Sequence, residues 1–309
     1  SAASDVYKRQ VLGLILNSCS GGSSIVAPIE TPPEYNPPIQ GTSTTCSDYT
    51  GDLTNVIWMD DFNDEDYSVN WTSIQGNGHE YGIPGWGNNE QQFYTDLENN
   101  VFVDKGCMKI TPLNQDFNGY SYTSAKMVTE NKVDFNHPGR ITVRFRSPIG
   151  TGMWPAIWMM PLESIYGGWP ASGEIDLVEI RGNNMQEVLS TIHYGSDPSN
   201  HKYQGGSYYL PQEDNLNEKF HTLTFIWQED QMEFILDNQF EVFSITKSQL
   251  GFNENYPFNE IFYLIINVAV GGNFVGNYVN SQDLCFNSDI DSCNDSQRFL
   301  IDWVIYESL

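Results

Sequence analysis

The sequence predicts an all-β protein, a β-sandwich of jelly-roll type in which two antiparallel sheets stack and one of them forms a concave substrate cleft. From about Asp48 onward, short runs rich in β-branched and aromatic residues recur between turn residues, and no long segment has helical periodicity. Some of these runs are apolar on one face and others on both, as two stacked sheets require. A chain of 309 residues fits one such domain, which we place at residues 48–309.

Three segments carry this prediction. In "RITVRFRSP", Ile141, Val143 and Phe145 alternate with polar residues, which gives a strand with one buried face. The runs "FHTLTFIW" and "MEFILD" are separated by "QEDQ" and predict a hairpin. In "IFYLIINVAVGG" both faces are largely apolar, so we expect a central strand that is covered on both sides.

Residues 1–19 are typical of an export segment. Lys8 and Arg9 precede a short apolar run at residues 11–16, and Asn17, Ser18 and Cys19 follow it. This pattern resembles a bacterial lipoprotein signal, which is cut before a cysteine whose thiol is then lipidated. An ordinary secretory signal is the alternative. Both predict an exported protein that contacts a membrane only through an N-terminal lipid anchor.

A linker and four cysteines support the same compartment. Residues 20–47 are rich in Ser, Thr, Pro and Gly, the composition of a flexible tether. Cys46, Cys107, Cys285 and Cys293 form an even set that can pair outside the cytosol. We expect Cys285 to pair with Cys293, which lies close in sequence, and Cys46 to pair with Cys107.

The charge of the chain limits its partners. A formal net charge of -26, from 14 Lys+Arg against 40 Asp+Glu, would repel a phosphate backbone, which excludes nucleic acid. Solubility alone accounts for most of this acid, and a neutral ligand such as a glycan is consistent with the rest. We expect a monomer.

One acidic strand raises a geometric question. In "SGEIDLVEIRG", side chains should alternate faces, so Glu174 and Asp176 share a face and Glu179 points the other way. A β-bulge, which adds one residue, would bring all three carboxyls to one face. The interleaved Ile175 and adjoining apolar residues argue against a simple solvated face. Glycoside hydrolases use a pair of carboxyl groups to cleave the glycosidic bond.

Tryptophans gather around these acids in the sequence. Trp154 and Trp158 share one face of a predicted strand, and Trp169 precedes Glu174 by five residues. A single Trp in a β-protein is usually core, but a group beside carboxyls suits a sugar site, because pyranose rings stack on flat indoles.

With these residues the sequence resembles glycoside hydrolase family 16, in particular its laminarinase-like endo-1,3-β-glucanases. The signature E-I-D-x-x-E, with an optional residue before the last Glu, matches residues 174–179, and Val178 is the optional residue. The resemblance implies a bulged strand in which Glu174 is the nucleophile, Glu179 is the acid/base and Asp176 orients Glu174. It implies no cofactor for catalysis.

Further matching segments are "GWGNNEQQFYT", "YTSAKMVT", "GMWPAIWMMP", "STIHYG", "INVAVGGNF" and "IDWVIYE". By position, the resemblance implies that Trp154, Trp158 and Trp169 face the glycan. It also implies that three polar side chains line the cleft, namely Asn88, Arg140 and His193. For His193, a structural role in the fold is an equal alternative.

The resemblance further implies a structural calcium ion far from the cleft. Its ligands would be Asp61, the Gly106 carbonyl and Asp302, since calcium prefers oxygen. Asp61 stands where the family usually has Glu, and two ordinary surface acids are the alternative.

The leading hypothesis is a retaining endo-β-1,3-glucanase that acts on laminarin-type β-glucan. A non-catalytic β-glucan-binding protein is the alternative from another class, but the presence of both glutamates favours catalysis. The same chemistry on mixed-linkage glucan is a further alternative, although the extra residue Val178 favours 1,3-linkages. Sulfated galactans rank low because the chain has few cations.

Overall fold

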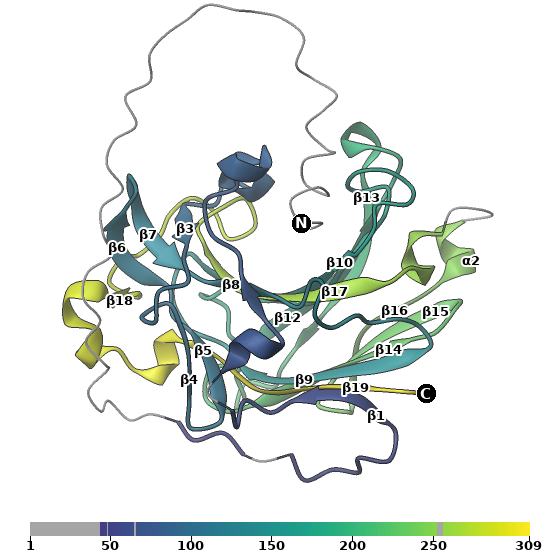
Figure 1. Cartoon of the computed structure of the whole chain (residues 1–309), viewed down its shortest axis with the longest axis horizontal. Coiled ribbons are helices and arrows are strands. Elements are labelled where there is room, and N and C mark those ends of the chain that lie inside the picture. Colours follow the sequence, from purple (N-terminus) through teal and green to yellow (C-terminus); the bar gives the residue numbers. More distant parts are fainter. Residues whose placement is uncertain (1–43, 48, 65, 252–255) are drawn as a thin grey trace, which may run out of the picture.

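The computed structural model describes residues 44–47, 49–64, 66–251 and 256–309. The expected export segment, and the expected linker up to residue 43, lie outside the described residues. Two large antiparallel sheets pack face to face, with a smaller third sheet at one end (Figure 1). This is the all-β sandwich that the sequence predicts.

The first large sheet, sheet A, contains eight strands in the order β16-β15-β14-β9-β19-β5-β4, with β1 paired to β19. Its strands are β1 (Val56–Asp60), β4 (Val101–Asp104), β5 (Cys107–Ile110), β9 (Gly139–Arg146), β14 (His221–Trp227), β15 (Gln231–Leu236), β16 (Phe240–Thr246) and β19 (Phe299–Glu307). The predicted hairpin is β14–β15.

The second large sheet, sheet B, has the order β13-β12-β11-β10-β17-β8-β2. Its strands are β2 (Thr72–Ser73), β8 (Lys126–Val128), β10 (Met153–Pro161), β11 (Glu174–Glu179), β12 (Glu187–Tyr194), β13 (Lys202–Tyr209) and β17 (Phe262–Val270). Every residue of β17 is buried, which confirms the central strand that its two apolar faces predict. The acidic strand β11 lies between β10 and β12.

Sheet C has the order β18-β6-β7-β3 and is formed by β3 (Gln92–Tyr94), β6 (Leu113–Phe117), β7 (Tyr120–Ser124) and β18 (Cys285–Phe286). The helical segments are short: η1 (Tyr67–Val69), η2 (His79–Tyr81), η3 (Pro84–Gly87), η4 (Pro198–Asn200), α2 (Lys247–Leu250), η5 (Pro257–Asn259), η6 (Asn287–Ser292) and η7 (Asp295–Gln297).

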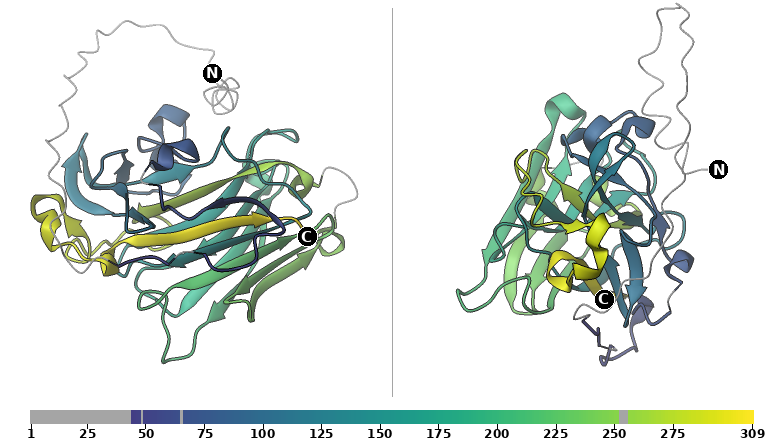
Figure 2. Two further views of the ribbon diagram at one scale, coloured as in Figure 1. Left: turned by 60° about the horizontal axis from the view of Figure 1, so that its bottom comes forward. Right: turned by 90° about the vertical axis from the view of Figure 1, so that its left-hand side faces the viewer.

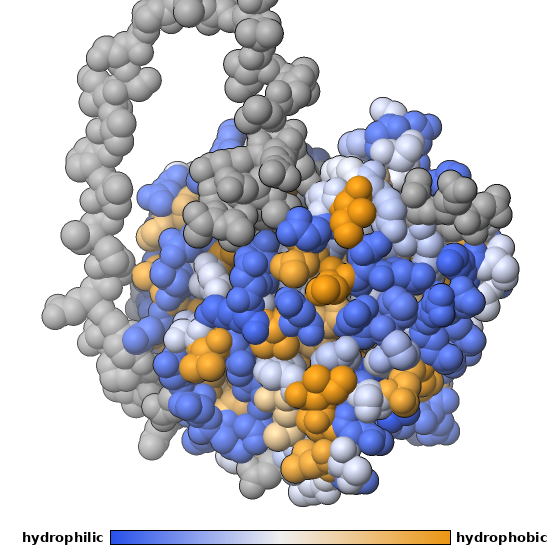
Figure 3. All heavy atoms as spheres, turned by 45° about the vertical axis from the view of Figure 1, so that its right-hand side comes forward, coloured by the Kyte–Doolittle hydropathy of each residue, from blue (hydrophilic) through white to orange (hydrophobic). Residues whose placement is uncertain are grey.

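The core fills the space between sheets A and B. Ile141, Val143 and Phe145 of β9 are fully buried there, as their alternation predicts. The strands of both sheets twist strongly (Figure 2). On the face drawn in Figure 3, hydrophobic residues form small patches among hydrophilic ones.

Both expected disulfides are present. Cys46 is bonded to Cys107 with Cα atoms 5.4 Å apart, and Cys285 is bonded to Cys293 with Cα atoms 5.2 Å apart. The first ties the start of the described chain to β5, and the second closes the η6 loop. Within the described part of the chain, no helix has the length and apolar character needed to cross a bilayer.

Candidate active site

A β-bulge in β11 brings the three acids to the outward face of sheet B. Against β10, Trp158 pairs with Asp176 and Ile157 pairs with Val178, so Leu177 is the residue passed over. Against β12 the register also shifts between Asp176 and Glu179. Leu177 and Val178 both turn into the core, where each is fully buried. The predicted bulge is confirmed, with the skipped residue one position before Val178.

Glu174 begins β11 and is held by an indole. Trp169 Nε1 donates a hydrogen bond to Glu174 Oε2 at 2.5 Å. Burial, together with the negative charge of Asp176, raises the pKa of Glu174 to about 7, although the Trp169 hydrogen bond opposes the rise. The side chain is therefore poised to change its charge near neutral pH.

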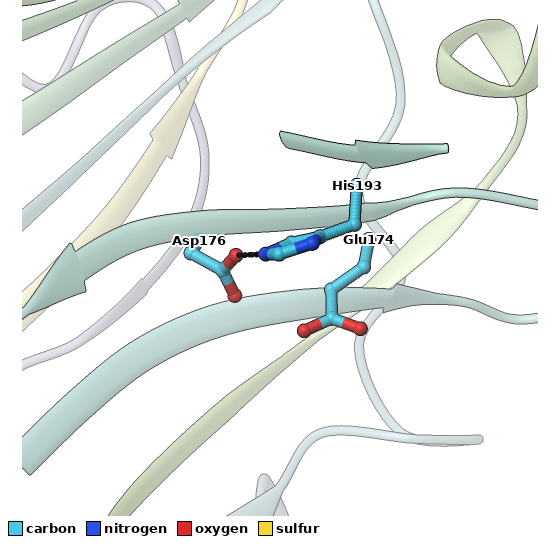
Figure 4. Close-up of side chains that lie close together, drawn as sticks. All are labelled: Glu174, Asp176 and His193. Atoms are coloured by element: carbon cyan, nitrogen blue, oxygen red, sulfur yellow. Dashed lines mark ion pairs between the residues drawn. The ribbon is translucent and has the colours of Figure 1, made fainter. Parts of the chain in front are cut away.

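Asp176 is paired with His193 of the neighbouring strand. His193 Nε2 lies 3.0 Å from Asp176 Oδ2, and Figure 4 shows the imidazole reaching from β12 toward the aspartate while Glu174 lies beside it. Burial alone would lower the pKa of His193, but contact with Asp176 and the charges of Glu174 and Glu179 raise it to about 9. The ion pair keeps a positive charge within the acidic group.

Glu179 ends the bulged strand opposite a small residue, Ala156 of β10. Burial raises the pKa of Glu179 to about 8, and the charges of Asp176 and Glu174 add to the effect. Thr191 Oγ1 is a distant donor at 3.5 Å from Glu179 Oε2. Glu179 therefore holds its proton to higher pH than Glu174 does.

Trp158 and Lys126 lie next to these acids. Trp158 Nε1 donates to Asn267 Oδ1 at 2.6 Å, and Asn267 in turn donates to Tyr94 Oη at 2.9 Å. The Lys126 ammonium lies 4.7 Å from the ring centroid of Trp158, a cation–π contact. Burial lowers the pKa of Lys126 to about 8 although the negative charge of Glu90 opposes it.

Trp154 lies near enough to Glu179 to lower its pKa, and Asn88 lies close to Trp154. Trp154 stacks on Phe274 with ring centroids 4.9 Å apart, so one face of its indole is covered by protein. Asn88 ends η3 and its side-chain amide lies 3.5 Å from Glu90 Oε1. A Cβ placed on Gly272 would lie 3.1 Å from the Asn88 carbonyl and 3.6 Å from Trp154, which places these residues close together.

Comparison with known proteins identifies this arrangement. Residues 88–304 match the family described as glycosyl hydrolases family 16. The chain belongs to glycosyl hydrolase family 16.

Named relatives agree with this assignment. A glucan endo-1,3-beta-glucosidase of Cryptopygus antarcticus is 38% identical over 232 residues, 71% of this chain and 81% of that protein. The glucan endo-1,3-beta-glucosidase A1 of Niallia circulans is 36% identical over 253 residues, 77% of this chain but only 37% of that longer protein. The solved endo-beta-1,3-glucanase of Pyrococcus furiosus superposes with a TM-score of 0.71 at 31% identity, covering 82% of this chain and 94% of that one.

Arg140 does not reach the family 16 site. It belongs to β9 in sheet A, where its neighbour Ile141 faces the core, so Arg140 points outward from the opposite side of the sandwich. There its Nη1 lies 3.8 Å from Glu307 Oε2. The expectation that Arg140 lines the substrate cleft is therefore wrong.

The expected calcium ligands have protein contacts of their own. Asp302 is fully buried, lies beside Arg144 and accepts the backbone N–H of Ser47 at Oδ1 at 3.1 Å, while its Oδ2 has no hydrogen-bond partner in the described part of the chain. Asp61 accepts from the backbone and side-chain amides of Asn63 at 3.3 and 2.8 Å, as the acceptor of a local turn. The calcium site at Asp61, Gly106 and Asp302 stays a prediction.

One group of acids and histidine has metal-like spacing. Among the residues that the structure describes, donor atoms of Glu174, Asp176 and His193 all lie within 4.8 Å of one another. Because the Nε2 of His193 is directed at Asp176, this spacing is that of an ion pair. Glycoside hydrolysis by two carboxyls needs no metal.

Three residues of the site were not singled out from the sequence. Glu90 and Lys126 lie within "GWGNNEQQFYT" and "YTSAKMVT", but nothing local showed that a buried carboxyl and a buried ammonium would meet there. His201 follows η4 and meets His193 across the β12–β13 hairpin. Two histidines eight residues apart around a Pro-containing turn were the available signal.

Proposed function

We propose that the protein is a retaining endo-β-1,3-glucanase that hydrolyses laminarin-type glucan by double displacement. The observation that carries the proposal is the bulge, which places Glu174, Asp176 and Glu179 on one face of sheet B. The names of the relatives support the 1,3-linkage, and the two glutamates argue against a protein that only binds glucan.

The two glutamates take different roles. The family 16 signature that residues 174–179 match makes Glu174 the nucleophile and Glu179 the general acid. Burial raises the pKa of both carboxyls to neutral pH or above, so that protons stay bound in this site near pH 7. Asp176 lies between the two glutamates in β11 and is paired with His193. The net charge of this pair sets the electrostatic potential at each glutamate.

In the first step a Glu174 carboxylate oxygen attacks the anomeric carbon. The glycosidic C–O bond breaks, the leaving oxygen takes the Glu179 proton, and a covalent glycosyl-enzyme forms. In the second step, water attacks the same carbon, gives its proton to the Glu179 carboxylate and displaces Glu174. Two inversions retain the anomeric configuration.

Proton NMR during early hydrolysis of laminarin tests the mechanism. We expect the β-anomer of the new reducing end to appear first and the α-anomer to grow later by mutarotation. An initial α-anomer would mean a single inverting displacement. Reducing-sugar release across laminarin, lichenan, agarose and carrageenan tests the substrate: we expect laminarin to lead, and release from lichenan at an equal rate would move the assignment to mixed-linkage glucan.

We further propose that the protein works as a monomer and is exported, either secreted or anchored to a membrane through a lipid on Cys19. The two disulfides support an oxidising compartment. Mass analysis of the membrane-associated protein would show an acylated Cys19 at the mature N-terminus. A mature soluble protein cut at another site would instead identify an ordinary secretory signal.

A further inference from the structure

His201 touches both side chains that hold the acids. Its Nε2 lies 2.7 Å from Nδ1 of His193, with the two rings nearly coplanar at 20° and their centroids 5.0 Å apart. On its other side, its ring centroid is 4.7 Å from that of Trp169. Trp169 donates to Glu174, and His193 is paired with Asp176. Through these four contacts, His201 is linked to Glu174 by way of Trp169 and to Asp176 by way of His193.

A hydrogen bond between two imidazole nitrogens needs one donor and one acceptor. His193 Nε2 lies 3.0 Å from Asp176 Oδ2 as an ion pair without the alignment of a hydrogen bond. In the charged ring that this ion pair requires, both Nε2 and Nδ1 carry a proton. His201 must then accept at Nε2, which fixes it as the neutral tautomer protonated at Nδ1. The pair therefore holds a single positive charge, and that charge sits on the ring that contacts Asp176.

We propose that His201 is a positioning residue for the double displacement, which holds the charged ring of His193 on Asp176 and packs the indole of Trp169 toward Glu174. The inference rests on the proposed function. It adds a residue that contacts neither glutamate and that the motif of β11 does not contain.

The groups around the two rings favour a charged His193 and a neutral His201. The titratable groups that face His193 are Glu174, Asp176 and Glu179 from β11 and, from the β13 side, His201 and Tyr203. Burial and the positive charge of His193 both lower the pKa of His201, which favours its neutral form. Tyr203 contacts both rings at about 6 Å through its own ring, without a hydrogen bond to either that the structure shows.

Lowering the pH should break the hydrogen bond between His193 and His201. A second proton on His201 removes the acceptor and places two cations beside each other, so the His193 ring is released from its orientation. The loss follows protonation of His201, below its lowered pKa, and is separate from the loss of activity caused by protonation of Glu174.

The experiment is an imidazole ¹H–¹⁵N NMR titration of the whole protein, which has five histidines. It compares wild type with His201→Phe, which keeps a ring against Trp169 but accepts no hydrogen bond, and with His201→Gln, which keeps an acceptor. Tyr203→Phe is the matched control for an altered aromatic neighbour. The kcat and KM for laminarin are measured on the same preparations.

We expect His201→Phe to lower the titration midpoint of His193 by about one pH unit and kcat by about tenfold, with little change in KM. His201→Gln should recover part of both, and Tyr203→Phe should leave the His193 midpoint where it is in wild type. An unchanged His193 midpoint in His201→Phe would overturn the proposal.

Wild type alone gives a second readout if a variant does not fold. At about pH 7.5 the spectrum should show His193 protonated on both nitrogens and His201 protonated on Nδ1 only; a neutral His193 would overturn the proposal. Because these spectra need no substrate, they stay informative even if laminarin proves not to be hydrolysed, an outcome that would defeat the proposed function and not the coupling of the two rings.

Discussion

Two buried groups of charged residues in this protein have opposite electrostatic character. The acid trio, Glu174, Asp176 and Glu179, lies on sheet B with one histidine as the cation paired to it. The Asp295 cluster lies at η7 before β19 of sheet A, where Lys109 and Arg298 contact one aspartate at 3.2 and 3.1 Å. Both are shielded from water, yet burial raises the pKa of both glutamates while the cations and hydrogen bonds around Asp295 lower its pKa despite burial.

The difference shows what burial alone cannot decide. An excess of acid over cation leaves protons bound near neutral pH, which suits proton transfer. An excess of cation fixes the carboxylate as an anion, which suits structure. The partner type matters as well, since His193 can itself titrate whereas arginine cannot.

The largest expected effect comes from removing either reactive glutamate. Glu174→Gln and Glu179→Gln should each lower kcat on laminarin by more than about a thousandfold while glucan affinity is largely kept, because these groups act on the transition state. Glu187→Gln is the matched control, since this buried β12 glutamate contacts Arg181 rather than the trio.

Kinetics and binding must be measured together here. Activity within about tenfold of wild type, roughly 1.4 kcal/mol in barrier, would show that the role assignment is wrong. A loss of binding as large as the loss of kcat would instead indicate that the substitution disturbs the sheet.

The next largest effect concerns stability. Asp295→Asn should lower the free energy of unfolding by roughly 3–5 kcal/mol at pH 7, because it leaves the buried Arg298 without its anion and Lys109 with only the partly exposed Asp104. Activity per folded molecule should not change. Asp104→Asn is the control: this carboxylate also contacts Lys109, at 2.9 Å, but its side chain is 38% exposed, so we expect a loss under about 1 kcal/mol.

Urea unfolding at two pH values completes this test. The pKa of Asp295 is lowered in the folded protein, so its contribution is present above the unfolded value of about 3.9 and is lost as pH falls through the folded value. The gap between wild type and Asp295→Asn should therefore narrow in strong acid. A constant gap would assign the effect to packing.

Much of the fold and part of the site follow from the sequence. The alternation in β9, the two-sided apolar pattern of β17 and the acid spacing of β11 each state a local geometry, and the structure has all three. The bulge was predictable because three acids within the six residues 174–179 make sense on one face only.

The alternation of apolar and polar residues along a strand predicts that a side chain faces outward. It does not predict which of the two sheets contains that strand. For this reason Arg140, correctly placed on a wet face, was assigned to the wrong side of the sandwich. The sequence position of Asp302 likewise does not reveal Arg144, which lies beside it on the adjacent strand. His201 depends on the β12–β13 register, in which His193 pairs with Tyr203, and on η4 turning it back toward the site.

A third prediction separates the alkaline stability of the two regions. Because the folded pKa of Glu174 is raised to about 7, its stabilising contribution is complete below the unfolded value of about 4.3 and is lost as pH rises through 7. His193, raised to about 9, contributes fully below about 6.5 and loses its contribution as pH rises through 9. Deprotonation of the acid trio and its histidine should therefore lower the free energy of unfolding as the pH rises.

Glu174→Gln tests this pH dependence by thermal unfolding at about pH 4 and pH 9. The amide carries no charge, so the melting temperature of the variant should exceed that of wild type at pH 9 by at least about 2 °C and should approach it at about pH 4, where the contribution of Glu174 is complete. A variant less stable than wild type at pH 9 would show that the lost Trp169 hydrogen bond outweighs the relief of charge.

The smallest expected effect is that of Trp169→Phe, which removes the indole N–H that Glu174 accepts at 2.5 Å and keeps one aromatic ring beside His201. That hydrogen bond lowers the pKa of Glu174, so without it the nucleophile should ionise at higher pH. We expect kcat/KM on laminarin to fall about tenfold near pH 6 and by less near pH 8, where Glu174 is ionised in both proteins. Trp303→Phe, on sheet A, is the control and should leave the pH profile unchanged. If Trp169→Phe instead lowers kcat/KM equally at every pH, the indole contacts the sugar but does not tune the nucleophile, and the electrostatic contrast between the two regions would rest on the charged groups alone.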